Sequence, residues 1–162
     1  MPLHETDALI LKTYKLGEAD RIVVFLSRDP QEHHQVVLAS GRPEGLAFNP
    51  INQISFHYRT LEDMRKAVAR LAQAGCTDGT PINHGNAWSV YIRDIEGNPM
   101  ELYVDSPWYT PQPCGEPFDL SKSDAEIYRD TEAMCRARPG FEPAEIWRAK
   151  LKQKIESAMA AR

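Results

Sequence analysis

The chain has 162 residues, of which 42% are hydrophobic and 26% are charged, and its formal net charge is -4. This length suits one domain, with or without an appended helical tail, and excludes two full-sized domains. The composition suits a packed core and excludes wholesale disorder. The acidic balance argues against a surface that neutralises phosphates, so nucleic acid is not an expected partner.

The location of the protein is predicted from its apolar runs, its first residues and its cysteines. The longest apolar run, residues 22–26, is far shorter than the roughly 20 residues that cross a bilayer, so we expect no membrane-spanning helix. Acidic residues and a histidine stand near the start, where a secretion signal would carry basic and then apolar residues. We therefore expect a cytoplasmic protein whose three cysteines are reduced thiols: Cys76, Cys114 and Cys135.

The first third of the chain predicts three strands. Residues 9–14 and 21–27 are rich in Leu, Ile, Val and Phe on the two sides of a glycine, which predicts two strands joined by a turn. A third strand is predicted over residues 33–39, where apolar and polar residues alternate. Residues 40–50 are rich in Gly and Pro and predict a loop.

The next segment predicts a strand followed by a helix with recognisable ends. Residues 51–58 predict the strand, and residues 60–74 predict a helix because apolar residues recur at steps of three and four. Thr60 is the expected N-cap, and Asp63 supplies the acidic third position of a capping box. Gly75 is expected to end the helix.

Three further strands complete a βαβββ unit. Residues 80–84, 88–93 and 100–104 have the composition of strands. Residues 94–98, between the last two strands, predict a hairpin turn.

The last third of the chain predicts an extended arm and two helices. Prolines crowd between residues 107 and 117, which excludes a helix or a central strand there. A helix is predicted through Arg136 with Asp119 or Ser121 as its N-cap, and a second helix is predicted over residues 143–161. Three residues of the second helix are expected to share one face: Ile146, Leu151 and Ile155.

Four stretches of the chain resemble a known superfamily. They are HHQVVLASG, NQISFHYRTLEDMRKAVARL, NHGNAWSVYIRD and EGNPMELYVDSPW. Together with the βαβββ order, they resemble the vicinal oxygen chelate superfamily of glyoxalases, bleomycin-resistance proteins and extradiol dioxygenases over about residues 25–124. The resemblance is to the branch that acts on dihydroxybiphenyl-like catechols. It implies an α+β fold in which residues 46–106 form one complete module.

The same resemblance implies that the partner module, within residues 1–45, is truncated or replaced. A complete first module needs a strand, a helix and three strands, but only 32 residues precede His33. Residues 5–29 resemble instead the start of the RecO recombination mediator. An incomplete module leaves an unpaired sheet edge, so we expect a homodimer. Residues 107–162 are expected to form the arm and the two C-terminal helices.

The resemblance also implies a metal site formed by the first and last strands of the complete module. The last strand carries Glu101, and a carboxylate between apolar strand residues is costly to bury unless a cation or a hydrogen-bond donor meets it. Gln53 occupies the first-strand position where ring-cleaving dioxygenases carry His and some glyoxalases carry Gln. An amide oxygen is a weak, neutral ligand, so the identity of the expected divalent ion stays open among Fe, Mn, Zn and Ni. A site without a metal is the remaining alternative.

Three more residues match the substrate side of the dioxygenase cleft. The resemblance implies that His34, His84 and Tyr91 orient and protonate an oxygenated molecule. Each residue also has a structural alternative. His84 could cap a turn, and Tyr91 could pair across the hairpin with Tyr103. His34 and Glu101 could be exposed polar residues of their strands.

Two functions of different classes follow from the resemblance. One is a metal-dependent enzyme that resembles extradiol dioxygenases and glyoxalases and acts on a small aromatic or oxygenated substrate. The other is a non-catalytic protein that binds or sequesters a ligand, as bleomycin-resistance proteins do. DNA binding through the RecO-like opening is a third hypothesis, which the acidic net charge disfavours.

Overall fold

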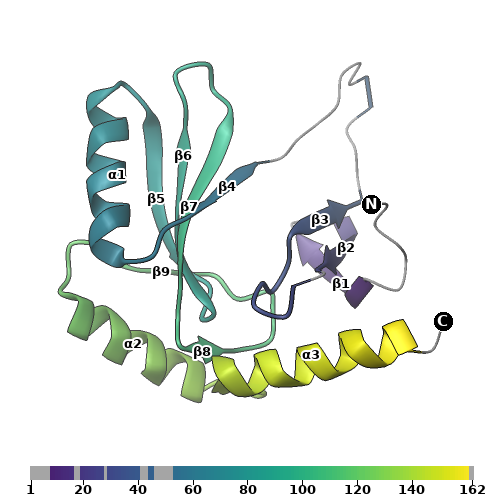
Figure 1. The fold of residues 1–162 in the computed structure, drawn as a ribbon. Coiled ribbons are helices and arrows are strands. Elements are labelled where there is room, and N and C mark those ends of the chain that lie inside the picture. Colours follow the sequence, from purple (N-terminus) through teal and green to yellow (C-terminus); the bar gives the residue numbers. More distant parts are fainter. Residues whose placement is uncertain (1–7, 17–18, 28, 41–43, 46–52, 161–162) are drawn as a thin grey trace. The chain divides into compact units, whose positions relative to one another are not determined.

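The computed structural model describes residues 8–16, 19–27, 29–40, 44–45 and 53–160 (Figure 1). The chain divides into two compact units. The module unit consists of residues 51–144, and the terminal unit consists of residues 1–50 and 145–162. None of the described helices is both long and apolar enough to span a membrane.

The module unit has the predicted βαβββ order within an α+β fold. It contains β4 (Ile54–His57), α1 (Leu61–Gln73), β5 (Thr77–Asn83), β6 (Ala87–Arg93) and β7 (Pro99–Asp105). Its sheet has the strand order β4-β7-β6-β5-β9, in which β4 runs parallel to β7 and the other neighbours are antiparallel. The start predicted for the first strand, at residues 51 and 52, lies outside the described residues.

Helix α1 has the predicted ends. The Thr60 hydroxyl accepts a hydrogen bond from the backbone N–H of Asp63 at 3.1 Å, which satisfies one free donor of the first turn. Gly75 follows the helix with a φ of +88°, in the left-handed region that favours glycine. The buried residues of the helix are Leu61, Met64 and Ala67.

Alternation along β6 and β7 divides their side chains between the two faces of the sheet. One set packs in the core together with the inner face of α1: Trp88, Val90, Ile92, Leu102 and Val104. The residues between them point to the opposite face. Figure 1 shows α1 on one side of this sheet, so polar residues such as Tyr91 and Glu101 lie on the face that α1 leaves uncovered.

The strand β5 ends one residue earlier than the sequence predicted. It runs from Thr77 to Asn83, so His84 lies in the turn that follows it. The reason is that Asn83 Oδ1 accepts the backbone N–H of Gly85 at 2.9 Å, which turns the chain. Asn83 therefore caps this turn with its side chain, and the ring of His84 is left for other contacts.

The proline-rich arm is extended, as predicted, and adds short strands to the module unit. β9 (Glu116–Pro117) pairs with β5 at the edge of the main sheet. β8 (Trp108–Tyr109) pairs with β10 (Glu142–Pro143) in a separate two-stranded sheet. The arm thereby joins the same compact unit as the βαβββ module.

Helix α2 (Asp124–Arg136) begins later than predicted. Its N-cap is Ser123, which forms a capping box with Glu126: each side chain accepts the backbone N–H of the other residue. The two predicted N-caps are wrong because they bond to each other and not to the helix: the Ser121 hydroxyl donates to Asp119 Oδ1 at 2.7 Å. Asp119 accepts the backbone N–H of Ser121 at 2.9 Å in a local turn before the helix.

Helix α3 (Ala144–Ala160) confirms the second predicted helix but not its predicted face. Leu151 is 5% exposed, whereas Ile146 is 46% exposed. Five residues correspond to about 140° around an α-helix, so these two side chains point in different directions. The expectation that they share a face is therefore wrong.

The terminal unit contains a three-stranded antiparallel sheet. Its strands are β1 (Ala8–Leu16), β2 (Ala19–Leu26) and β3 (Val36–Ala39), in the order β1-β2-β3. The predicted hairpin is confirmed, but the third strand begins at Val36 and not at residue 33. The chain is still turning before Val36, because the backbone N–H of Gln35 donates to the Leu26 carbonyl at 2.8 Å.

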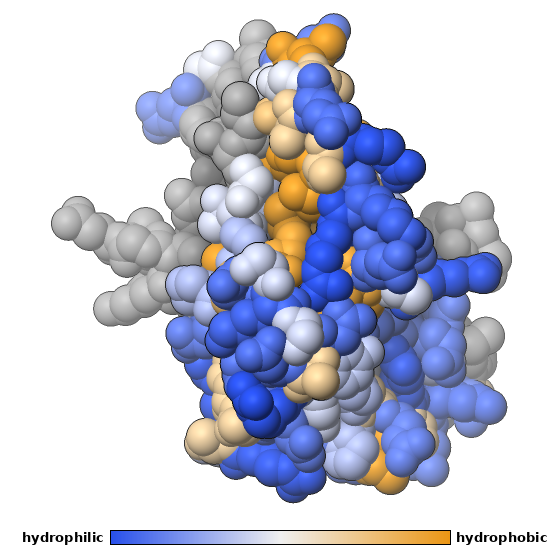
Figure 2. Space-filling view, turned by 90° about the vertical axis from the view of Figure 1, so that its left-hand side faces the viewer, coloured by the Kyte–Doolittle hydropathy of each residue, from blue (hydrophilic) through white to orange (hydrophobic). Residues whose placement is uncertain are grey.

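The outer surface beside α1 is mostly hydrophilic. Figure 2 looks at the side of Figure 1 on which α1 lies and shows blue residues over most of it, with an orange band down the upper part.

Among the described residues of β4, Ile54 and Phe56 are 53% and 46% exposed. Exposed apolar side chains on an edge strand favour association with another surface.

Candidate functional site

The pairing of three strands places a row of polar side chains on the uncovered face of the sheet. Tyr91 of β6 lies directly across from Glu101 of β7. On the other side of β7, Ser55 of β4 lies directly across from the same Glu101. Side chains in such cross-strand pairs have Cβ atoms about 4.5–5.5 Å apart, so the three groups can form hydrogen bonds with one another.

Glu101 is the centre of this row. Its Oε2 atom accepts hydrogen bonds from Gln53 Nε2 at 2.8 Å and from Ser55 Oγ at 2.6 Å. Its Oε1 atom accepts a hydrogen bond from the Tyr91 hydroxyl at 2.9 Å. The side chain is 8% exposed. Three donors therefore compensate the burial of this carboxylate, which excludes the alternative of a solvent-facing strand residue.

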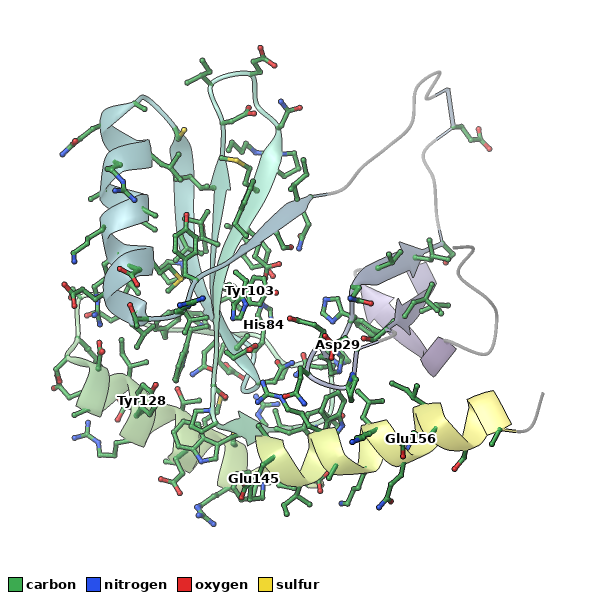
Figure 3. The ribbon with its side chains drawn as sticks, in the orientation of Figure 1. Asp29, His84, Tyr103, Tyr128, Glu145 and Glu156 are labelled. Carbon is green, nitrogen blue, oxygen red and sulfur yellow. The ribbon has the colours of Figure 1, made fainter. Side chains whose placement is uncertain are left out.

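Tyr91 and His84 extend the row toward the arm. His84 Nε2 lies 2.9 Å from the Tyr91 hydroxyl, and His84 Nδ1 lies 2.6 Å from the carbonyl oxygen of Cys114. Figure 3 labels His84, which follows β5, and Tyr103, which lies on β7. The structure thus brings together four of the five residues predicted for the site: Gln53, His84, Tyr91 and Glu101.

The environment of Tyr91 keeps its hydroxyl protonated. Burial raises the pKa of Tyr91 well above its usual value of 10.0, and the charge of Glu101 and the hydrogen bond to its carboxylate raise the pKa further. Tyr91 is therefore a hydrogen-bond donor throughout the ordinary pH range. Its partner across the hairpin is Glu101, so the alternative of an aromatic pair with Tyr103 is wrong.

A second row lies next to the first on the same face. Tyr103 of β7 pairs with Ser89 of β6 on one side and with His57 of β4 on the other. The rings of His57 and Tyr103 are stacked, with centroids 4.8 Å apart and an interplanar angle of 13°. His57 Nε2 lies 3.4 Å from Asp105 Oδ2. An exposed imidazole on a half-buried phenol gives this face an aromatic surface beside Glu101.

Four members of the two rows were not expected to take part in a site: Ser55, His57, Ser89 and Tyr103. The available signal was the period of two along each strand, because Ser55 and His57 follow Gln53 at steps of two and Tyr103 follows Glu101 by two.

His34 belongs to the terminal unit and not to the module unit. Its Nδ1 atom lies 2.7 Å from that of His33, in the loop before β3. Its predicted role in the site stays a prediction.

The donor set around Glu101 does not fit a transition-metal ion held by this chain. Gln53 presents its amide nitrogen to the carboxylate, and both ring nitrogens of His84 already contact other groups. Within the described part of the chain, no three His, Cys, Asp or Glu side chains are grouped so that they could hold a metal ion. Protein sites for zinc, iron and related metals need about three such ligands. We therefore derive no chemical step through a metal.

A hollow of about 240 Å³ lies elsewhere in the module unit. Residues of β9, α2 and the turn between them line it, including Phe118, Lys122, Ile127 and Asp130. Lys122 and Asp130 form an ion pair at 2.9 Å. None of the site residues around Glu101 lines this hollow, so it is separate from the two polar rows.

The fold agrees with a comparison against known families. Residues 4–102 match the model of the Glyoxalase/Bleomycin resistance protein/Dioxygenase superfamily. The chain belongs to this superfamily. The predicted vicinal oxygen chelate fold is therefore confirmed.

Two similar proteins are dioxygenases of Rhodococcus globerulus. The chain is 34% identical over 87 residues to biphenyl-2,3-diol 1,2-dioxygenase 3, which is 51% of this chain and 45% of that protein. It is 31% identical over 113 residues to biphenyl-2,3-diol 1,2-dioxygenase 2, which is 59% of this chain and 58% of that protein. The chain thus spans about half the length of these relatives.

Two further comparisons give weaker similarities. The chain is 33% identical over 85 residues to the DNA repair protein RecO of Bifidobacterium animalis subsp. lactis (strain AD011), which is 49% of this chain and 36% of that protein. A glyoxylase/bleomycin resistance protein/dioxygenase domain from Frankia sp. EAN1pec matches with 22% identity and a TM-score of 0.32, over 62% of this chain and 77% of that chain.

Proposed function

We propose that the module unit binds a small aromatic molecule that carries hydroxyl groups, on the face of the sheet around Glu101. The observation that carries the proposal is the hydrogen-bonded row of Glu101, Tyr91 and His84. These side chains offer both donors and acceptors to ligand hydroxyls. The neighbouring stack of His57 on Tyr103 offers a flat surface to an aromatic ring.

The names of the two Rhodococcus relatives supply a first ligand to test. Both act on a biphenyl-2,3-diol, a molecule with an aromatic ring and two adjacent hydroxyl groups. Such a diol suits a face that combines an aromatic stack with a row of hydrogen-bonding groups. In this proposal the side chains of the protein bind the diol directly and not through a metal ion, because the donors around Glu101 do not fit a metal ion.

Calorimetric titration of the full chain with biphenyl-2,3-diol, after dialysis against EDTA, tests the proposal. We expect saturable binding, and we expect Tyr91→Phe to weaken it about tenfold, because one hydrogen bond of about 1.4 kcal/mol is lost. Glu132→Gln serves as the control, since Glu132 pairs with Arg136 on α2, away from the residues around Glu101. The absence of saturable binding, or equal affinities in all three proteins, would contradict the proposal.

The same protein distinguishes ligand binding from the metal-dependent catalysis expected from the sequence. The full chain is incubated with Fe²⁺, Mn²⁺, Zn²⁺ or Ni²⁺ in separate samples, desalted and analysed for metal content. One equivalent of metal that is lost in Glu101→Gln would replace the proposal by a metal-dependent enzyme. Equal, low metal content in both proteins would support binding without a metal.

A further inference from the structure

The hollow lined by β9 and α2 lies on the opposite side of the sheet from Glu101. Asn83 of β5 lines this hollow and pairs directly across from Trp88 of β6. Trp88 is part of the core that packs with α1, so Asn83 points to the same face of the sheet as that core. Tyr91 and Glu101 pair with each other on the other face. The hollow is therefore a second place in the module unit where a ligand has room.

Two buried polar side chains at the hollow each have a hydrogen that no described residue accepts. Thr131 is 0% exposed, and its Oγ1 atom accepts hydrogen bonds from Asn83 Nδ2 and Trp88 Nε1, both at 2.7 Å. Its hydroxyl hydrogen has no acceptor among the described residues.

Asn83 is in the same situation. It is 6% exposed, and its Oδ1 atom accepts the backbone N–H of Gly85 at 2.9 Å, which fixes the orientation of the amide. The amide nitrogen has two hydrogens, and Thr131 is its acceptor for one of them. Buried donors that lack an acceptor are unfavourable, so an oxygen in the hollow that met both hydrogens would be bound.

The wall beside these donors is apolar. It is formed by Ile127, which is 3% exposed, and by the half-buried Phe118 and Met134. A phenyl ring and a thioether both make favourable contacts with an aromatic ring. A cavity of about 150 Å³ holds one benzene ring, so the 240 Å³ of this hollow has room for a ring with a small polar substituent.

The charged residues of the lining disfavour an anion. They comprise three carboxylates and one ammonium group: Glu116, Asp119, Asp130 and Lys122. Lys122 already forms an ion pair with Asp130 at 2.9 Å. A carboxylate or phosphate in the hollow would therefore meet an excess of like charge, whereas a neutral molecule would not.

We propose that this hollow binds a small neutral molecule in which a carbonyl group is attached to an aromatic ring. Thr131 Oγ1 and Asn83 Nδ2 lie 2.7 Å apart, so one oxygen can accept a hydrogen bond from each of them. A carbonyl oxygen has the two lone pairs that this arrangement requires. The ring then lies against Phe118, Ile127 and Met134. This site is independent of the function proposed for the face around Glu101, because the two sites share no residue.

Methyl NMR of the full chain, titrated with benzamide, tests the proposal. The methyl signals of Ile127 and Met134 are assigned with Ile127→Val and Met134→Leu. We expect these signals to shift saturably, with a dissociation constant in the millimolar range. The absence of a saturable shift, which leaves water alone in the hollow, would overturn the proposal. Larger shifts at residues around Glu101 than at these two methyl groups would also overturn it.

Two further compounds test the chemical class of the ligand on the same parent chain. Benzoate has the ring and the acceptor oxygens of benzamide but carries a negative charge. Benzylamine has the ring and a positive charge but no acceptor oxygen. We expect both to bind at least about tenfold more weakly than benzamide. Equal or tighter binding of either compound would overturn the assignment of a neutral carbonyl ligand.

Variants of Thr131 test the role of its hydrogen. Thr131→Val removes the hydroxyl at nearly constant size and is expected to weaken benzamide binding about tenfold, whereas Thr131→Ser restores it. Glu132→Gln is the matched control, because its neighbouring side chain pairs with Arg136 and does not line the hollow. Circular dichroism confirms that each variant is folded. If Thr131→Val does not fold, Met134→Trp replaces it, since an indole fills the hollow and should abolish binding. Unchanged benzamide affinity in either folded variant would overturn the proposal.

Discussion

Replacement of Tyr91 by Phe is expected to destabilise the protein by about 3 kcal/mol. The substitution keeps the ring and removes a hydroxyl that contacts both Glu101 and His84 at 2.9 Å. A hydrogen bond to a charged group is worth about 1.5–3 kcal/mol. Glu101 is 8% exposed, so water can replace little of its lost partner. The half-buried His84 replaces part of its lost hydrogen bond by one to water. The expected loss of unfolding free energy is therefore close to the upper value for one hydrogen bond to a charged group, about 3 kcal/mol.

Urea unfolding of the full chain, followed by circular dichroism at pH 7, measures this loss. Tyr128→Phe is the control, because Tyr128 is an exposed residue of α2 whose ring packs against Trp88 and Trp108. Its free energy of unfolding is expected to change by less than about 0.5 kcal/mol. A change in Tyr91→Phe that is no larger than in the control would refute the reasoning, because the hydroxyl could not then be part of a buried hydrogen-bonded row.

Three further outcomes are expected. Met64→Ala should lower the free energy of unfolding by about 2–5 kcal/mol in the same urea assay, because Met64 is fully buried between α1 and the sheet. A loss no larger than that of a surface substitution would contradict the described core. Burial, and secondarily the nearby Cys114, raises the pKa of Cys135 to about 11, so the folded state holds this proton more tightly than the unfolded state. The stabilisation is then complete below pH 9.0 and is lost as the pH rises toward 11, so the slope of unfolding free energy against pH in this range should become flatter in Cys135→Ala. Phe56→Lys, on the exposed side of β4, should convert the expected homodimer to a monomer in light scattering, whereas a monomeric parent chain would rule the dimer out.

The hairpin of β6 and β7 was predictable from local sequence. Its strands alternate between core and opposite face, and the turn that joins them contains Asp94, whose carboxylate accepts the backbone N–H groups of Glu96 and Asn98. A turn of this kind sets the register of the two strands, because each residue that is added or removed shifts every pair. The direct pairing of Tyr91 with Glu101 follows from that register.

The partners that Glu101 finds on β4 were less accessible to sequence reasoning. Ser55 and Gln53 lie 46 and 48 residues before Glu101, and β4 runs parallel to β7. A parallel pair has no tight turn that fixes its register, and three elements intervene in the chain between these two strands: α1, β5 and β6. The resemblance predicted that Gln53 and Glu101 lie close together, but the position of Ser55 in the row depends on the register of the completed sheet.

Errors at the helix ends had a local cause. Asp119, Ser121 and Ser123 are all good N-cap residues by type. Ser121 and Ser123 each have an acidic residue three positions later, but Asp124 pairs with Arg65, whereas Glu126 closes the capping box with Ser123. Asp119 satisfies the backbone of Ser121 instead. Residue type alone could not decide between these arrangements, because the ion pair of Asp124 with Arg65 joins residues that lie 59 positions apart in the chain.

The strongest difference between the sequence and the structure concerns what balances the charge of Glu101. A buried carboxylate predicts a cation or a set of donors, and residue types alone cannot separate the two. In the structure, three donors meet Glu101: Gln53 Nε2, Ser55 Oγ and the Tyr91 hydroxyl. The Tyr91 hydroxyl also contacts His84, whose Nδ1 lies 2.6 Å from the carbonyl oxygen of Cys114 in the proline-rich arm, 30 residues further along the chain. The arm that pairs with β5 at the edge of the sheet therefore helps to hold the His84 ring against Tyr91.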